Sequence, residues 1–214
     1  MSNARGAERP GVAVFAKAPV PGTVKTRLIG RLGARGAARL HEALVDRALA
    51  TAAESSLDPV ELWCSPDAGH GFFAACADRH RVRLRAQAGR DLGERMAFAF
   101  EDAFAHARPL VLVGSDCPAL RSRDLLDAAD ALLDHDAAIT PAEDGGYVLI
   151  ALARRIPELF SDMPWGTDRV MQHTRERLAA ACARWLELPQ RWDVDRPEDL
   201  ERMRREGLLA QTAW

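Results

Sequence analysis

The chain has 214 residues, of which 48% are hydrophobic, so it is long enough for one α/β domain with a sizeable core. The formal net charge of −2, with basic residues interspersed among acidic ones, argues against a nucleic-acid partner. The four cysteines, Cys64, Cys76, Cys117 and Cys182, lack CxxC spacing, which argues against a zinc site and against a disulfide framework.

The first ten residues are polar, and we expect residues 1–10 to be disordered and residues 11–210 to form a single nucleotide-binding domain. They contain no hydrophobic signal core, and no apolar run in the chain approaches the roughly 20 residues that span a bilayer. We therefore expect a cytoplasmic protein without a membrane span. The sequence leaves its oligomeric state open.

Short apolar runs alternate with longer segments of helical periodicity. The runs predict strands at 11–15, 59–64, 82–84, 109–114, 137–140, 146–151 and 184–188, and the very apolar 109–114 is expected to be central. Helical spacing predicts helices at 34–53, 69–79, 92–106, 125–133, 167–181 and 197–206. Strands separated by helices predict an α/β fold of three layers, in which helices cover both faces of a mostly parallel sheet.

The loop after the first strand holds the only two lysines of the chain, Lys17 and Lys25, against 27 arginines. A compact ammonium suits a phosphate oxygen, and a cationic loop at a strand end suits a polyphosphate. Val24 stands where a Walker A motif requires Gly, so the loop is not of that type. We expect Lys17, Gly22, Lys25 and Arg27 to bind phosphates and Lys25 to be catalytic. The alternative is a surface loop with two lysines by chance.

Two acidic motifs later in the chain predict a site for Mg²⁺ or Mn²⁺. Asp116 follows the central strand, where its carboxylate could be catalytic by holding the ion beside a phosphate, or could merely cap a turn. Asp193 and Asp195 alternate in an extended segment and would point the same way. Like charges on one face call for a cation, so we expect Asp116, Asp193 and Asp195 to be the metal ligands. Asp195 could instead form a capping box with Glu198.

The segment 87–95 opens a predicted helix and could contact the base or the ribose of a nucleotide. The expected contacts there are Gln87, Gly93 and Arg95. No histidine has a Ser or Cys partner that would support nucleophilic catalysis.

Two glycine-containing loops are candidates for the acceptor or sugar site. Adjacent glycines before the 146–151 strand could bind an anion or a hydroxyl through their N–H groups, although an Asp-Gly pair also favours an ordinary tight turn. The loop at 163–167 could cover an acceptor, or its threonine could cap the following helix. The residues expected at this site are Asp144, Gly145, Gly146, Trp165, Gly166 and Thr167.

Five motifs together resemble a bacterial group of GT-A-fold proteins described as glycosyltransferases or nucleotide-diphospho-sugar transferases. They are FAKAPVPGTVKTRL at 15–28, GSDCPAL at 114–120, PAEDGGY at 141–147, MPWGT at 163–167 and DVDRPEDL at 193–200. The resemblance covers about residues 11–205 and implies a three-layer, Rossmann-like GT-A fold.

More distantly, the chain is similar to the molybdenum-cofactor nucleotidyltransferases and the phospholactate guanylyltransferases. In those relatives the first loop carries Lys or Arg for a triphosphate, and an Asp after the central strand binds the metal. On that similarity Lys25 and Arg27 would meet phosphates, and Asp116, Asp193 and Asp195 would hold Mg²⁺. The chain lacks the glycine-dense opening loop of the molybdenum enzymes, so their base preference cannot be carried over.

The expected activity is that of a metal-dependent transferase that uses an activated nucleotide. Nucleotidyl transfer to a small-molecule acceptor, with release of pyrophosphate, is narrowly favoured because two lysines suit a triphosphate. Glycosyl transfer from a nucleotide sugar would use the same residues and matches the usual description of the group. A non-catalytic nucleotide-binding module is the alternative from another class. The expected partners are a nucleoside triphosphate or nucleotide sugar and an acceptor that the sequence does not identify.

Overall fold

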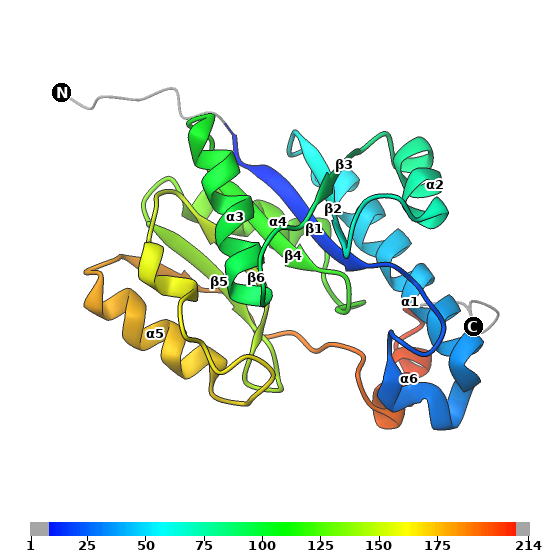
Figure 1. Cartoon of the computed structure of the whole chain (residues 1–214). Coiled ribbons are helices and arrows are strands. Elements are labelled where there is room, and N and C mark those ends of the chain that lie inside the picture. Colours follow the sequence, from blue (N-terminus) through cyan, green and yellow to red (C-terminus); the bar gives the residue numbers. More distant parts are fainter. Residues whose placement is uncertain (1–8, 209–214) are drawn as a thin grey trace.

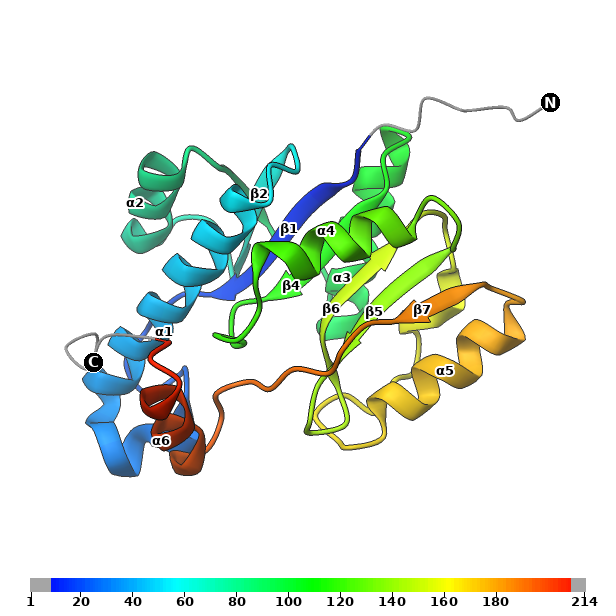
Figure 2. The same ribbon diagram turned by 180° about the vertical axis from the view of Figure 1, so that it is seen from behind.

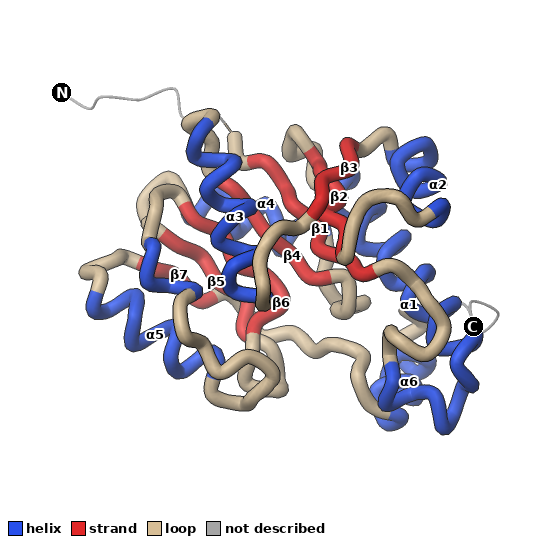
Figure 3. Tube along the Cα trace, in the orientation of Figure 1, coloured by secondary structure: helices blue, strands red, loops and turns tan. Residues whose placement is uncertain are grey.

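The computed structural model describes residues 9–208 and contains a seven-stranded sheet with helices on both faces (Figures 1 and 3). Residues 1–8 of the stretch predicted to be disordered, and residues 209–210 of the predicted domain, lie outside the described residues. Residues 9 and 10 are described, and Pro10 is buried. The strands are β1 Gly11–Lys17, β2 Val60–Ser65, β3 Arg83–Ala86, β4 Leu110–Gly114, β5 Ala137–Pro141, β6 Tyr147–Leu152 and β7 Trp185–Glu187. The helices are α1 Ile29–Glu54, α2 Gly71–His80, α3 Leu92–Ala105, α4 Ser122–Ala131, α5 Val170–Ala180 and α6 Pro197–Arg205, with 3₁₀ turns η1 Thr26–Leu28 and η2 Pro157–Phe160.

Every predicted strand and helix is present, with small changes of boundary. The largest change is at α1, which extends back to Ile29 through a kink. Gly33 forms that kink with a φ of 69° and a ψ of 163°, a conformation of positive φ that costs glycine little. The predicted start at residue 34 therefore coincides with the straight part of the helix.

The strand order is β3-β2-β1-β4-β6-β5-β7, and β6 runs antiparallel to both of its neighbours while all other pairs are parallel. The prediction of a mostly parallel α/β sheet is confirmed. The reversal at β6 follows from the short connection at 142–146, because a parallel crossover needs a dozen or more residues. As predicted, β4 lies in the middle of the sheet.

Alternation along the strands divides the core between the two faces of the sheet. On one face, Val14 of β1 packs in a cluster with Val45 of α1 and Leu125 of α4. On the other, Phe15 belongs to a cluster with Phe100 of α3, and that cluster also includes residues of α5 and η2. Figure 2 shows α1 and α4 in front of the sheet, and Figure 1 shows α3 in front of the opposite face. Neighbouring residues of one strand thus belong to different layers.

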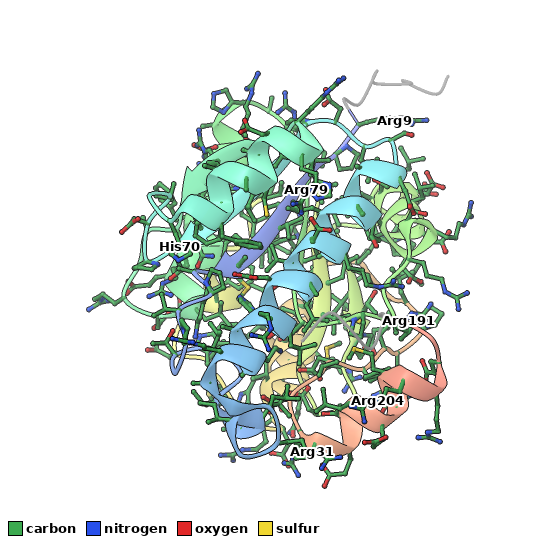
Figure 4. The ribbon with its side chains drawn as sticks, turned by 90° about the vertical axis from the view of Figure 1, so that its right-hand side faces the viewer. Arg9, Arg31, His70, Arg79, Arg191 and Arg204 are labelled. Atoms are coloured by element: carbon green, nitrogen blue, oxygen red, sulfur yellow. The ribbon has the colours of Figure 1, made fainter. Side chains whose placement is uncertain are left out.

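A connecting segment, residues 188–196, crosses from β7 at one end of the sheet to α6 beside the first turns of α1 (Figures 1 and 2). A third apolar cluster fixes it there, in which Trp192 and Val194 pack with Leu28, Leu40, Leu44, Leu200 and Met203. Figure 4 shows α6 against the lower end of α1, with Arg31 and Arg204 on the two helices. The segment 188–196 therefore brings residues 193–195 close to the loop that follows β1.

The carboxyl ends of β1, β2, β3, β4, β5 and β7 lie along one edge of the sheet, and the hairpin before β6 returns to the same edge. In open α/β sheets this is the edge that receives ligands. Within residues 9–208, no helix combines the length and the hydropathy that crossing a membrane requires.

Candidate active site

A pocket of about 650 Å³ opens at the carboxyl ends of β1 and β4. Its walls come from the loop after β1, the loop after β4, the start of α3 and the segment that leads to α6. Seven of the predicted site residues line it: Lys17, Lys25, Arg27, Gln87, Arg95, Asp116 and Asp195. Arg27 and Asp195, which are 168 residues apart along the chain, thus share one cavity, as the sequence predicted for the phosphate and acidic motifs.

Lys25 is the most enclosed cation of this pocket, with only 4% of its side chain exposed. Its backbone adopts the left-handed conformation, φ 47° and ψ 42°, which is uncommon for a residue with a Cβ. The ammonium Nζ donates a hydrogen bond of 2.6 Å to the carbonyl of Val194 and lies 2.8 Å from Oδ1 of Asp116. Lys25 therefore joins the first loop to two other segments.

Asp116 presents one oxygen to the protein and the other to the pocket. Its Oδ1 is buried, whereas 47% of the side chain is exposed, so the exposed part includes the second oxygen. Burial opposes ionisation, but the charge of Lys25 and the nearby His41 outweigh it and hold the pKa of Asp116 below its usual range. The carboxylate is ionised and available, as a metal or substrate ligand requires. The alternative role as a turn cap is not observed.

His41 of α1 was not recognised from the sequence. Its ring is buried, with Nε2 3.0 Å from the carbonyl of Lys17 and Nδ1 3.7 Å from Oδ1 of Asp116. A histidine beside Leu40 and Leu44 on the buried face of a helix carries no signal for a site, because any core residue can occupy that position.

Arg27 forms an ion pair with Asp195, so the first loop and the segment 188–196 meet a second time. The capping box of Asp195 and Glu198, the alternative to a metal-binding role, is not formed. The N-cap of α6 is Arg196, and Asp199 accepts hydrogen bonds from the backbone N–H groups of Arg196 and Asp195 at 2.7 and 2.9 Å. Asp195 turns toward Arg27 instead, because a cation lies within its reach.

Asp193 lies among other carboxylates. Its burial, together with the negative charges of Asp144 and Asp116, raises its pKa to about 6. Crowded carboxylates of this kind are the donor set that Mg²⁺ or Mn²⁺ favours, so Asp116 and Asp193 fit the predicted ion. Asp195 pairs through one oxygen with Arg27, as Asp116 pairs through one oxygen with Lys25, and it lines the pocket, whereas Asp193 does not. Over residues 9–208, no three His, Cys, Asp or Glu side chains form a ready-made metal site.

The wall opposite the first loop comes from the start of α3. Gln87 donates through Nε2 to the carbonyls of Trp63 and Ala16, at 2.8 and 3.4 Å. Arg95 donates to the carbonyl of Gly89 and to Oγ of Ser65, both at 3.2 Å. Both predicted residues are thus held against the strand ends.

Two further pocket residues on this wall, Asp91 and Leu92, were not predicted. Asp91 is the N-cap of α3 and accepts from the N–H of Glu94 at 2.9 Å. The position of Asp91 before a predicted helix indicates an N-cap, and that role alone accounts for the residue, so nothing in the sequence separately indicated that Asp91 lines a pocket.

Gly22 and Gly93 do not line the pocket. Gly22 allows a tight turn, and Gly93 allows a close contact between two segments. The carbonyl of Val20 accepts from the N–H of Thr23 at 3.1 Å, and Gly22 has a φ of 89°, as a tight turn after Pro21 requires. A Cβ on Gly93 would lie 2.3 Å from the carbonyl oxygen of Phe160. Direct ligand contact by these two glycines is not supported.

The expected acceptor residues do not line the pocket, but they lie at the same edge of the sheet, in turns that pack on one another. Asp144 accepts from the N–H of Gly146 at 2.9 Å within the hairpin that joins β5 to β6. Gly145 has a φ of 90° and touches Asp168 at the start of the α5 region. This is the tight turn that an Asp-Gly pair favours.

Trp165 packs edge-on against Tyr147 at a ring-centroid distance of 6.4 Å, which places its loop beside the same hairpin. Thr167 donates from its hydroxyl to the carbonyl of Pro164 at 2.8 Å, and the N-cap of α5 is Arg169. The Thr167 hydroxyl also accepts from the N–H of Arg169 at 3.4 Å, so Thr167 stabilises the loop before α5 but is not itself the N-cap. Gly166 has a φ of 78° and no neighbour where a Cβ would lie.

Comparison with known proteins places the chain in a family. A family profile described as "Uncharacterized protein conserved in bacteria (DUF2064)" matches residues 48–167. A protein from Desulfovibrio desulfuricans G20, provisionally described as a nucleotide-diphospho-sugar transferase, has a structure that matches with a TM-score of 0.85 and 33% sequence identity, over 96% of this chain and 90% of that one. A comparison with curated proteins gave no match.

Two other solved structures share the fold at lower identity. A nucleotidyl transferase from Methanothermobacter thermautotroptrophicus matches with a TM-score of 0.66 and 15% identity, over 94% of this chain and 99% of that one. The 4-diphosphocytidyl-2C-methyl-D-erythritol synthase of Anaerococcus prevotii DSM 20548 matches with a TM-score of 0.63 and 11% identity, over 94% and 97%. At these identities the likeness shows the fold alone, which confirms the predicted GT-A-like architecture. On its sequence match and its likeness to the Desulfovibrio protein, the chain belongs to the bacterial family DUF2064, a family with the fold of nucleotide-using transferases.

Proposed function

We propose that this protein is a Mg²⁺- or Mn²⁺-dependent nucleotidyltransferase, which transfers a nucleoside monophosphate from a nucleoside triphosphate to a small-molecule acceptor and releases pyrophosphate. One observation carries the proposal. The cations of the first loop and the carboxylate of Asp116 line the same pocket at the ligand-binding edge of the sheet. The descriptions of the solved relatives as nucleotidyl and nucleotide-sugar transferases support the same class of substrate.

The pocket supplies positive charge from two sides. Lys17, Lys25 and Arg27 come from the first loop, where Lys25 and Arg27 each also pair with a carboxylate, and Arg95 comes from the α3 wall. Cations fixed around a phosphate chain neutralise it in the bound state and favour the extra charge that develops on a departing pyrophosphate. Gln87 and Leu92 lie on the α3 wall, where they would contact the base or the ribose.

A divalent ion bound by Asp116 and Asp193 would supply further charge neutralisation at the phosphates. The electrostatic surroundings of these two carboxylates differ. Lys25 keeps Asp116 ionised and fixes one of its oxygens, whereas Asp193 is partly desolvated among negative neighbours. The turns that contain Asp144 and Trp165 lie at the same edge and would receive the acceptor.

Glycosyl transfer from a nucleotide sugar is the second candidate, and the description of the Desulfovibrio relative favours it. The two reactions differ in the group that leaves, which is pyrophosphate in nucleotidyl transfer and a nucleoside diphosphate in glycosyl transfer. The purified protein should be incubated with Mg²⁺, with each nucleoside triphosphate or nucleotide sugar, and with pools of small phosphorylated and hydroxylated acceptors.

The products of that assay distinguish the candidates. Acceptor-dependent pyrophosphate supports nucleotidyl transfer, and acceptor-dependent nucleoside diphosphate supports glycosyl transfer and contradicts the first proposal. A rise in melting temperature with nucleotide, but no turnover with any acceptor pool, would indicate a binding module. A preparation in which Asp116 is replaced by Asn serves as the blank, because it removes the pocket carboxylate while keeping its shape.

A further inference from the structure

The only two lysines of the chain differ sharply in their surroundings, although both line the pocket. The side chain of Lys17 is exposed, and within residues 9–208 no acceptor pairs with its ammonium. The side chain of Lys25 is almost fully enclosed, and two acceptors face its Nζ. The two ammonium groups carry the same charge, but only that of Lys25 is already paired among the described residues, so Lys17 can attract an anionic ligand more strongly.

The contacts of Lys25 join three segments that are remote along the chain. The ammonium reaches Asp116 after β4 and the carbonyl of Val194 before α6. The same two residues are also bonded directly, since the N–H of Val194 donates to the carbonyl of Asp116 at 2.9 Å. The side chain of Lys25 thus closes a small ring of contacts that fixes both segments.

This ring determines what remains available for a ligand. Asp116 uses Oδ1 toward Lys25 and keeps its other oxygen toward the pocket. Val194 lies between Asp193 and Asp195, so fixing its carbonyl also restrains the backbone of the two acidic residues beside it. An ammonium that is already paired with a carboxylate at 2.8 Å attracts a phosphate much less strongly than an unpaired ammonium does.

We propose that Lys25 is a positioning residue, which holds Asp116 and the 193–195 segment in place for a divalent ion, and that Lys17 is the lysine that contacts the phosphates. The proposal deepens the proposed function and rests on it. Lys17 contributes affinity for the phosphate chain whether or not the ion is present. Lys25 contributes only through the carboxylates, and therefore only when the ion is present.

The test measures nucleoside triphosphate binding by isothermal titration calorimetry, with Mg²⁺ and with EDTA, for Lys17→Met, Lys25→Met and the control Arg123→Met. Met keeps the length of the side chain and removes its charge. Arg123 pairs with Asp127 on the exposed face of α4 and does not line the pocket, so its replacement should leave both affinities unchanged. The triphosphate tested is the one that binds the unaltered protein most tightly.

Lys17→Met should lower the affinity by about tenfold or more under both conditions, the value of one charge-assisted phosphate contact. Lys25→Met should keep the EDTA affinity within about twofold of that of the unaltered protein and lose the increase that Mg²⁺ provides. An equal loss in EDTA for the two lysine variants would overturn the proposal, because it would make Lys25 a direct phosphate ligand.

Lys25→Met leaves Asp116 without its partner and could prevent folding, so the double variant Lys25→Met/Asp116→Asn is measured beside Asp116→Asn alone. Removing both charges together avoids an unpaired buried carboxylate oxygen. The double variant should bind the triphosphate in EDTA as Asp116→Asn does, and a further tenfold loss would again overturn the proposal. Failure of the unaltered protein to bind any triphosphate or nucleotide sugar would refute the proposed function as well, whereas normal binding with equivalent lysines would refute the division of roles alone.

Discussion

At the scale of single residues, two glycines show how surroundings decide what a position requires. Gly145 and Gly166 both have a positive φ, 90° and 78°. A Cβ on Gly145 would lie 2.1 Å from the carbonyl oxygen of Asp168, whereas nothing lies within 4 Å of a Cβ on Gly166. Gly145 is therefore required both for its backbone conformation and for its close contact with the backbone of Asp168, whereas Gly166 is required for its backbone conformation alone.

Replacing Gly145 by Ala should lower the free energy of unfolding by about 2–4 kcal/mol, because the methyl group adds a steric clash to the cost of a left-handed backbone. Gly166→Ala should cost about 1 kcal/mol, the backbone contribution alone. Urea denaturation of both variants measures the difference. Equal costs would mean that the hairpin moves away from Asp168 without penalty.

The residue scale also shows why the site could be predicted only in part. The types and order of the motifs predicted that Lys25 and Asp116 would meet, because both follow parallel strands. The pairing of Arg27 with Asp195 could not be predicted, since it joins residues 168 positions apart. Local spacing suggested a helix cap for Asp195, and a distant cation overrode it.

At the scale of elements, α4 is tied to the segment 188–196 by one carboxylate. Asp124 is only 8% exposed and accepts from Arg191 through both oxygens, at 2.5 and 3.2 Å. It also accepts from the N–H of Arg121, the first orphan donor of the helix, at 2.9 Å. The start of α4 and the path toward α6 therefore share a single anchor.

Asp124→Ala should lower the free energy of unfolding by about 3 kcal/mol, because it leaves Arg191 without its partner and α4 without a cap. Asp127→Ala on the same helix is the matched control. Asp127 pairs with the exposed Arg123, so its loss should cost about 0.5 kcal/mol or less. Thermal and urea denaturation of the two variants test this, and similar stabilities would show that Asp124 anchors nothing.

The elements themselves were largely predictable, since apolar runs and helical spacing located every strand and α-helix of residues 9–208. The reversal of β6 was also present in the sequence, because residues 142–146 are too few for a crossover to a parallel strand. The order of the strands was not. Placing β1 between β2 and β4 depends on packing between segments that local patterns do not describe.

At the scale of the whole molecule, the reactivity of three of the four cysteines measures how tightly the helices on one face pack against the sheet. Cys64, Cys76 and Cys117 all belong to the apolar cluster beneath α1, α2 and α4. Burial, with smaller contributions from neighbouring charges, raises the pKa of Cys64 and Cys117 to about 12 and that of Cys76 to about 11. Cys182 is exposed.

In the folded protein, one thiol per chain should therefore react rapidly with a disulfide reagent at pH 8, and all four should react in denaturant. The Cys182→Ser variant should show no rapid reaction. A second fast thiol in the folded protein would contradict this arrangement, since it would mean that the helices on that face separate from the sheet in solution.

Because the pocket occupies the carboxyl rim of the sheet, the opposite rim is open to engineering. The turn at 107–109 joins α3 to the amino end of β4, and Ala107 already adopts a loop conformation with a φ of 54°. An affinity peptide grafted there would tether the protein to a sensor surface with the pocket facing the analyte. Screening of immobilised protein against metabolite mixtures would then leave the substrate entrance unobstructed.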